Sequence, residues 1–233
     1  MPMVRLLEAC RRRGRQPLVL HAGTVTQTGF SARLPVDETH PDNPMTVYDL
    51  HKQMAENYLK YYAGQGIVRG VALRLANVYG PGPGSSSAER GLLNIMVRRA
   101  LAGEPLTIYG EGDYLRDFVY VDDVVDAFLM AGAGLDAHPD RLNGRHFVVG
   151  SGRGSTIADS IRLVADRVAR KTARRVPVIH VAPPKPPLPI EARDFVADPR
   201  GIAAATGWRA RVSLAEGIDH TIEYYRAGVV RHS

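Results

Sequence analysis

The sequence has 233 residues, of which 45% are hydrophobic and 23% are charged. This balance is typical of a soluble globular protein and excludes a disordered chain. No stretch approaches the roughly 20 consecutive apolar residues that span a bilayer, and the first residues lack the apolar core of a secretion signal. The single cysteine, Cys10, can form neither an internal disulfide nor a thiolate zinc site. We therefore expect a cytoplasmic protein with no membrane attachment and no metal centre.

The net charge is +6, but the basic residues are scattered in short groups beside apolar helical repeats. Scattered charge is typical of solvated helix faces and argues against a nucleic-acid partner. Only four of the 30 basic residues are lysines, so the rest are arginines. Because the planar guanidinium of arginine binds phosphate through two hydrogen bonds, a phosphorylated small molecule is the expected partner.

The expected elements alternate between helix and strand along the chain. In order they are a helix over 3–13, a strand over 17–20, a helix over 47–64, a strand over 68–77, a helix over 88–102, strands over 106–109 and 118–121, a helix from 122, a strand over 146–149, and helices over 156–169, 199–206 and 213–226. The proline-rich run over 183–189 can continue neither a helix nor a central strand, so it is expected to be an extended connection. This alternation predicts an α/β fold with a largely parallel sheet covered on both faces.

Tyr48 and Lys52 are four residues apart in the second expected helix, so their side chains lie on one face. A phenol is a poor acid-base catalyst at neutral pH unless its charged form is stabilised. An ammonium about 4 Å away contributes ~4 kcal/mol to that stabilisation at an effective dielectric of ~20. Tyr48 could then exchange a proton with a substrate hydroxyl or carbonyl. An exposed helical pair without function is the alternative, and the spacing alone does not decide between them.

Four segments in a fixed order give the wider context. They are residues 19–29 around Thr24, the pair Tyr48 and Lys52, Leu-Arg-Leu-Ala-Asn-Val-Tyr-Gly-Pro over 73–81, and Arg-Asp-Phe-Val-Tyr-Val-Asp-Asp over 116–123. Together they resemble the extended short-chain dehydrogenase/reductase family, which includes nucleotide-sugar epimerases, dehydratases and ketoreductases. The resemblance runs from the first helix to about Tyr225.

The resemblance implies a Rossmann-like doubly wound parallel sheet that lacks its N-terminal strands, with a smaller C-terminal substrate-binding subdomain. Residues 1–80 would form the C-terminal half of the dinucleotide-binding domain and carry the catalytic helix. Residues 81–233 would mainly bind the nucleotide sugar, with the segment near 116–150 returning to the Rossmann core.

The resemblance also implies a catalytic set. Thr24 would hydrogen-bond the reacting sugar oxygen, Tyr48 would transfer its proton, and Lys52 would hold the nicotinamide ribose and favour the phenolate. Contacts to NAD or NADP would come from Ala22, Gly23, Tyr48, Lys52, Leu75 and Val78, with NADPH favoured for a reductase. The alternative for Thr24 is a turn hydroxyl that bonds its own backbone.

The substrate implied by the resemblance is a nucleotide-diphosphate sugar. Asn77 would reach a phosphate or sugar group, and Arg116 would clamp the diphosphate. An ion pair with Asp117 or Asp123 is the alternative for Arg116, and a buried strand tyrosine is the alternative for Tyr109. The remaining substrate contacts would be Thr24, Leu92, Thr107, Tyr109 and Arg193.

The sequence departs from the family at its start. No Gly-x-x-Gly-x-x-Gly turn precedes Tyr48, and the first helix resembles one that the family reaches after roughly a hundred residues. The later glycines, over 80–84 and 150–154, lack the fingerprint spacing. About half of the dinucleotide-binding domain would then be missing, which would leave an open apolar sheet edge. We expect completion by another chain, a rebuilt protein, or a true start upstream of Met1. Homodimerisation through the helices over 47–64 and 88–102 is a family expectation.

The residues after Thr24 bear on the reaction. Family dehydratases place an Asp-Glu pair there, whereas this sequence has Val25 and Thr26, so dehydration is not expected. The local segments look most like the 4-ketoreductases that make deoxysugars for bacterial natural products. The expected reaction is reduction of the C4 keto group of a dTDP-4-keto-6-deoxyhexose, with Tyr48 as proton donor. A nucleotide-sugar 4-epimerase and a non-catalytic remnant that binds a sugar nucleotide are the alternatives.

Overall fold

The computed structural model describes residues 2–82, 91–183 and 192–230. The chain divides into two compact units. The first comprises residues 1–76, 124–152 and 195–209, and the second comprises residues 77–123, 153–194 and 210–233. Residues 195–209 thus belong with the first unit, whereas the sequence-based division at residue 80 placed them in the other part. Each unit is described by itself.

The elements follow the predicted alternation. The helices are α1 (Pro2–Arg13), α2 (Val47–Gly64), α3 (Leu92–Ala102), α4 (Val121–Ala137), α5 (Pro139–Leu142), α6 (Ile157–Thr172), α7 (Arg200–Thr206) and α8 (Leu214–Val230), with a 3-10 helix η1 (Val25–Thr28). The strands are β1 (Leu18–Thr24), β2 (Arg69–Leu75), β3 (Asn77–Tyr79), β4 (Leu106–Tyr109), β5 (Leu115–Tyr120), β6 (Arg145–Val149), β7 (Gly154–Thr156) and β8 (Val178–Val181). Residues 88–90 of the helix expected over 88–102 and most of the proline-rich run lie outside the described residues.

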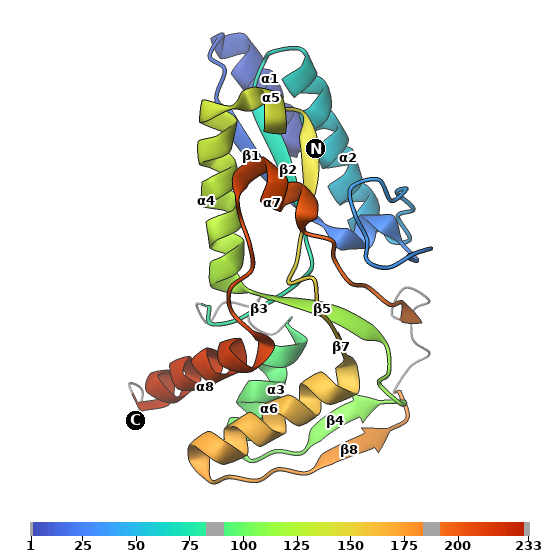
Figure 1. Cartoon of the computed structure of the whole chain (residues 1–233), viewed down its shortest axis with the longest axis vertical. Helices are drawn as coiled ribbons and strands as arrows, with labels where there is room; N and C mark the ends of the chain where they lie inside the picture. Colours follow the sequence, from blue (N-terminus) through green and yellow to red (C-terminus); the bar gives the residue numbers. More distant parts are fainter. Residues whose placement is uncertain (1, 83–90, 184–191, 231–233) are drawn as a thin grey trace. The chain divides into compact units, whose positions relative to one another are not determined.

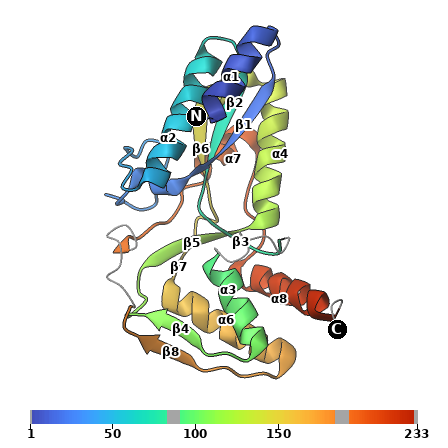
Figure 2. The same cartoon turned by 180° about the vertical axis from the view of Figure 1, so that it is seen from behind.

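The first unit is built on a parallel sheet with the strand order β1-β2-β6. Helices α1 and α2 lie on one side of this sheet and α4 lies on the other, as both views show (Figure 1, Figure 2). Residues 70–74 of β2 are all buried, as expected for a central strand covered on both faces. The α/β architecture with a parallel sheet is therefore confirmed.

Close packing holds α2 against the sheet. A Cβ atom on Gly70 would lie 2.6 Å from Cδ1 of Leu59, so a larger residue at this point of β2 would require the Leu59 side chain to shift. Leu7 of α1 and Val68 join Leu59 in the same buried cluster. Near the end of the unit, the side chain of Trp208 is buried, with 1% of the residue exposed.

The described residues of the second unit form two small sheets. In one, β5 pairs parallel to β3 and antiparallel to β7, and in the other β4 pairs parallel to β8. Helices α3, α6 and α8 enclose a core that includes Val97, Ile108, Ile161 and Ile218. The sequence did not predict β7 or β8, which are three and four residues long.

The strand expected over 68–77 divides after Leu75. The Ala76 N–H donates to the carbonyl of Val149, and the next residue, Asn77, begins a strand of the second unit. Within the ranges that the structure describes, none of the helices is both long and apolar enough to cross a membrane.

Candidate functional site

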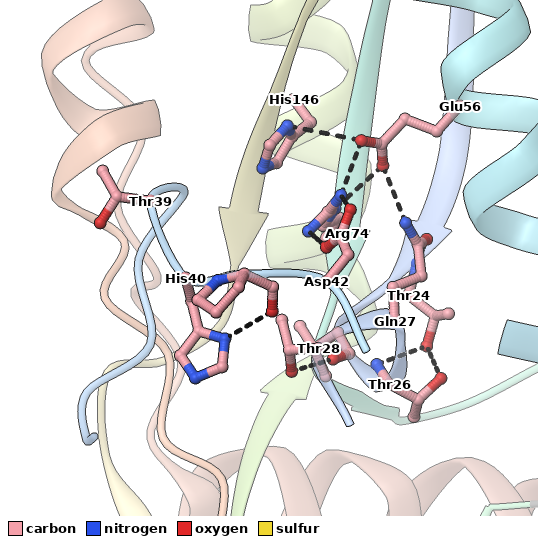
Figure 3. A network of polar contacts seen from close by, with 12 residues as sticks. Thr24, Thr26, Gln27, Thr28, Thr39, His40, Asp42, Glu56, Arg74 and His146 are labelled. Carbon is pink, nitrogen blue, oxygen red and sulfur yellow. Dashed lines mark hydrogen bonds and ion pairs between the residues drawn. The ribbon is translucent and has the colours of Figure 1, made fainter. Parts of the chain in front are cut away.

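Thr24 stands where β1 ends and η1 begins. It is 8% exposed and pairs with Leu75 at the end of β2. Its hydroxyl lies 3.0 Å from that of Thr26 and accepts the Thr26 N–H at 3.3 Å, and its own N–H donates to Oε1 of Gln27 at 3.2 Å (Figure 3). The hydroxyl therefore makes the local turn contact that the sequence offered as the alternative to catalysis. Its catalytic role stays a prediction.

Tyr48 and Lys52 lie together on the first turns of α2, as their spacing predicts. Nζ of Lys52 is 5.7 Å from the centre of the Tyr48 ring and donates to the Ala22 carbonyl at 2.7 Å. Burial lowers the pKa of Lys52. The Tyr48 side chain is 58% exposed, so a substrate can reach it. The structure thus joins the predicted pair to the end of β1.

A second contact ties the Thr24 turn to α2. The Thr26 hydroxyl donates to Oδ1 of Asp49, which is 2% exposed. The same carboxylate caps the helix, because Oδ2 of Asp49 accepts the Thr46 N–H at 3.2 Å while the Asp49 N–H donates to the Thr46 hydroxyl at 3.1 Å. The residue that follows Tyr48 is therefore fixed both to the helix start and to the turn that carries Thr24.

A buried ion cluster lies behind this turn (Figure 3). Arg74 of β2 donates from Nε and Nη2 to the two oxygens of Glu56 at 2.9 and 2.8 Å, and from Nη1 and Nη2 to those of Asp42 at 2.6 and 2.8 Å. Gln27 completes the connection by donating from Nε2 to Oε2 of Glu56 at 3.1 Å. Glu56 and Gln27 are fully buried, and Arg74 is 2% exposed.

Lys60 and His146 border the cluster. Burial alone would raise the pKa of Glu56, but the hydrogen bonds and charge of Arg74, followed by His146 and Lys60, lower it to about 2. Burial and the charge of Arg74 lower the pKa of His146 to about 4. The Lys60 ammonium donates to Nδ1 of His146 at 2.7 Å, which fits a neutral ring with its proton on Nε2. Among the described residues, no group of three or more His, Cys, Asp or Glu could hold a metal ion.

Gly23, a predicted cofactor contact, is close to the cluster. A Cβ atom at this position would lie 3.3 Å from the Leu73 carbonyl and 3.4 Å from both Cγ of Arg74 and Oε1 of Gln27. A side chain would therefore press on the residues that hold the Thr24 turn. Two further predicted cofactor contacts lie at this sheet end, where the Ala22 carbonyl accepts from Lys52 and Leu75 pairs directly with Thr24. Val78 lies in the second unit.

The second unit brings two of the predicted substrate residues together. Arg116 of β5 and Arg193 are 9% and 7% exposed. Nη1 of Arg116 donates to the Leu115 carbonyl at 2.9 Å and also to the carbonyl of Arg193. Asp194 fixes the same strand, because its Oδ1 accepts the Leu115 N–H at 2.8 Å. The structure thus places Arg193 directly beside Arg116.

Apart from Thr24, the other predicted substrate residues lie on β3, α3 and β4 of the second unit. Asn77 pairs with Phe118 across β3 and β5, and Leu92 begins α3. Thr107 and Tyr109 lie on β4, where the Tyr109 ring is 57% exposed. The alternative of a buried strand tyrosine at position 109 is therefore wrong. The roles of these residues remain predictions.

Sequence reasoning missed the residues that hold the turn and the cluster, which are Thr26, Gln27, Asp42, Asp49, Glu56 and Arg74. Two of them had a detectable signal. Glu56 continues the four-residue spacing of Tyr48 and Lys52, and Arg74 interrupts the apolar run over 70–76. A charge inside a buried strand implies a buried partner, which the sequence could not identify.

Residues 1–150 match the NAD dependent epimerase/dehydratase family. The chain is 33% identical over 223 residues to the UDP-glucose 4-epimerase of Mycolicibacterium smegmatis, covering 96% of this chain and 66% of that protein. It is 28% identical over 183 residues to the dTDP-4-dehydro-6-deoxyglucose reductase of Escherichia coli, covering 78% of this chain and 53% of that protein. This chain thus spans about two thirds or less of the length of these relatives.

Among solved structures, the UDP-glucose 4-epimerase of Thermotoga maritima with UDP-glucose matches with a TM-score of 0.82 and 30% identity. The match covers 97% of this chain and 69% of that one. This structural match extends over both units, beyond the 150 residues of the family match. The chain belongs to the NAD dependent epimerase/dehydratase family.

Proposed function

We propose that this chain takes part in NAD(P)-dependent oxidoreduction at C4 of a nucleoside-diphosphate sugar. The observation that carries the proposal is the position of the Lys52 ammonium, 5.7 Å from the centre of the exposed Tyr48 ring and bonded to the end of β1. The exposed Tyr48 hydroxyl can exchange a proton with a bound substrate, and the neighbouring ammonium can hold polar groups of a substrate or cofactor beside it. Family membership supplies the reaction class.

In this proposal Tyr48 gives its proton to the sugar oxygen during reduction and takes it back during oxidation. Thr24, at the end of the neighbouring strand, hydrogen-bonds the same oxygen and orients it. For this contact its hydroxyl keeps the Thr26 N–H as donor and turns its own proton to the substrate. Lys52 keeps its place through the Ala22 carbonyl.

The residues of this chain fit the nicotinamide end of the cofactor. The cofactor supplies hydride transfer when it is bound. One of the three Lys52 N–H donors goes to Ala22, and the others suit ribose hydroxyls. Gly23 and Leu75 give a small and an apolar surface at the strand ends. The glycine-rich turn that binds a pyrophosphate is not found ahead of Tyr48 in this sequence.

The second unit is the proposed binder of the nucleoside diphosphate. Arg116, whose guanidinium lies at the Arg193 carbonyl, would clamp the diphosphate, and Arg193 would add a second contact. Thr107 and the exposed ring of Tyr109 would flank the base, while Asn77 and Leu92 would contact the phosphate or sugar. No nucleic acid is needed as a partner.

Two reactions share this side-chain chemistry. The sequence predicts reduction of a dTDP-4-keto-6-deoxyhexose with NADPH, in deoxysugar synthesis for natural products, and the similarity to the Escherichia coli reductase supports it. The higher identity to a UDP-glucose 4-epimerase favours 4-epimerisation as the second candidate. The two differ in whether the hydride returns to the same sugar from which it came.

The test supplies both substrate pairs to the purified chain. Loss of NADPH absorbance with dTDP-4-keto-6-deoxyglucose supports the reductase, and conversion of UDP-glucose to UDP-galactose in the presence of NAD supports the epimerase. Calorimetric titration with each sugar nucleotide runs in parallel. Binding of a sugar nucleotide without turnover of either would favour the non-catalytic alternative and contradict the proposed activity.

The proposed partner protein is a second copy of this chain or a chain that completes the sheet. Val47, Leu50 and Tyr61 of α2 are 69%, 44% and 64% exposed, which supports self-association through this helix. Strand β1 is an edge of the sheet in the described structure, which supports strand addition. Sedimentation equilibrium of the wild type and of Leu50→Glu tests the first possibility, because a charge at this position should dissociate a dimer.

A further inference from the structure

We propose that Gln27 is a positioning residue for Thr24. Its amide is held by Glu56 of the buried Glu56–Arg74 ion pair and in turn holds the end of β1 in place. The inference rests on the proposed function of Thr24 and deepens it. Gln27 is fully buried, and its two amide ends face different groups. Oε1 accepts the Thr24 N–H at 3.2 Å, and Nε2 donates to Oε2 of Glu56 at 3.1 Å.

These two contacts fix the orientation of the amide. If the group turned over, Oε1 would face the carboxylate of Glu56 and Nε2 would face the N–H of Thr24. An acceptor would then face an acceptor and a donor would face a donor in a buried place, where an unsatisfied polar group costs ~1–3 kcal/mol. Gln27 therefore acts as a directional link between the ion pair and Thr24 (Figure 3).

The far end of the link is immobilised. The Glu56 carboxylate accepts from Nε and Nη2 of Arg74, and Arg74 also binds both oxygens of Asp42. Lys60 contributes a further ion pair to Glu56. Charged, two-pronged hydrogen bonds of this kind are strong and geometrically specific, and the absence of solvent strengthens them. A side chain bonded to Glu56 thus has a well-defined position.

Thr24 is consequently tied to α2 at two places. One tie runs through Gln27 to Glu56, and the other runs through Thr26, whose N–H donates to the Thr24 hydroxyl and whose own hydroxyl donates to Asp49. Asp49 and Glu56 are seven residues apart, which is about two helical turns. Lys52 lies between these two residues and Tyr48 directly precedes Asp49, so both ties set the place of Thr24 with respect to the proposed proton donor.

This arrangement predicts a catalytic effect that a purely structural residue would not have. Displacing a reactant or a catalytic group by about 1 Å can cost about a hundredfold in rate. Loss of the Gln27 link should therefore lower kcat, since Thr24 orients the reacting oxygen. It should leave KM nearly unchanged, because most of the proposed sugar-nucleotide contacts lie on other residues.

The first test compares Gln27→Met with the matched control Thr28→Val. Both residues are buried in η1 and each substitution removes buried hydrogen bonding, but the Thr28 hydroxyl donates only to the Val25 carbonyl of its own turn. Amide hydrogen exchange measured by NMR is the readout that needs no turnover. We expect the Thr24 amide to exchange about tenfold faster in Gln27→Met and to keep the wild-type rate in Thr28→Val. An unchanged Thr24 rate in Gln27→Met would overturn the proposal.

Turnover of the substrate identified for the wild type provides the second readout. We expect kcat to fall about ten- to a hundredfold in Gln27→Met with KM within about threefold, and Thr28→Val to match the wild type. A rise in KM with an unchanged kcat, or equal losses in both variants, would overturn the positioning role. If the wild type turns over none of the substrates, the proposed function fails, and the exchange data alone then decide whether Gln27 holds Thr24.

Gln27→Glu provides a conservative rescue with its own signature. A protonated carboxyl can donate to Glu56 and accept from Thr24, as the amide does, whereas an ionised one would face a second carboxylate. We expect the kcat of this variant, relative to the wild type, to recover as the pH is lowered and to fall as it is raised. A ratio that is independent of pH would contradict the link between Gln27 and Glu56.

Discussion

Arg74 donates two hydrogen bonds to the carboxylate of Glu56, and these two side chains are 2% and 0% exposed. The pair joins β2 to α2 at the level where β1 ends, since Arg74 is the sheet partner of Gly23. Two charges so far from water are costly unless each is fully paired. The cluster therefore ties the stability of the first unit to the geometry of the candidate site.

Removing the shared cation should destabilise the protein strongly. Arg74→Met leaves the carboxylates of Glu56 and Asp42 without their common partner, and breaking a buried pair costs about 3–5 kcal/mol. Urea unfolding measures the free energy. The control is Arg162→Met. The side chains of Arg162 and its partner Asp159 are 54% and 69% exposed, so this ion pair should contribute less than about 1 kcal/mol. Equal losses in the two variants would contradict the importance of burial.

Acid should unfold the protein through two groups in turn. In the folded chain the pKa of His146 is lowered from 6.5 to about 4 and that of Glu56 from 4.5 to about 2. Between pH 6.5 and 4 for His146, and between pH 4.5 and 2 for Glu56, the group is protonated in the unfolded chain but not in the folded chain. The free energy of unfolding therefore falls as the pH falls, by about 1.4 kcal/mol per pH unit for each group. His146→Gln should show a shallower loss than the wild type between pH 6.5 and pH 4 in urea titrations. Identical slopes would show that His146 does not titrate in this way.

Tyr48→Phe should abolish most of the activity. The substitution keeps the ring near Lys52 but removes the group that transfers the proton, which is commonly worth a factor of 10² to 10⁴. The free energy of unfolding should change by less than about 0.5 kcal/mol, because the side chain is 58% exposed. The measurement is kcat with the preferred substrate, alongside binding of the sugar nucleotide. Activity within a few-fold of the wild type would refute the role of Tyr48.

Arg116→Lys should weaken binding of the nucleoside diphosphate by about tenfold, because an ammonium cannot reproduce the two-pronged contact. Isothermal titration with dTDP or UDP measures the affinity. Arg162→Lys, an exposed change in the same unit, is the control and should bind as the wild type does. If both variants bind equally well, the diphosphate is held elsewhere.

Gly29→Ala should destabilise the segment that leads to α2. Gly29 has a φ of +64°, and a Cβ atom there would lie 2.3 Å from the Asn43 carbonyl oxygen. Thermal unfolding should show a loss of about 1–3 kcal/mol. Gly64→Ala is the control, because a Cβ atom at this position near the end of α2 would meet no neighbouring side chain or distant backbone atom within 4 Å. This substitution should be neutral or slightly stabilising. A neutral Gly29→Ala would mean that this segment can adjust freely.

The sequence predicts the longer elements and the candidate pair well. Tyr48 and Lys52 share a helix face because their spacing matches the helical period, and the four ordered segments point to the family that the comparisons confirm. Strand β8 was not predicted, and it pairs in parallel with β4, which lies about 70 positions earlier in the chain. Local sequence cannot supply that information.

The ion cluster was not predictable for a related reason. Asp42, Glu56 and Arg74 are separated by 14 and 18 positions, and only the tertiary fold brings them together. The sequence marks Arg74 as unusual within an apolar strand but does not identify its partners. The same holds for Gln27, whose place in the site depends on the Glu56 carboxylate.

Trp208 is the only tryptophan in the chain, and it is buried in the first unit. Its intrinsic fluorescence is therefore a natural reporter of that unit alone, whereas circular dichroism also registers α3, α6 and α8 of the second unit. Superimposable denaturation curves from the two signals would indicate one cooperative transition. Different midpoints would show that the two units unfold separately, and no added label would be needed to detect this.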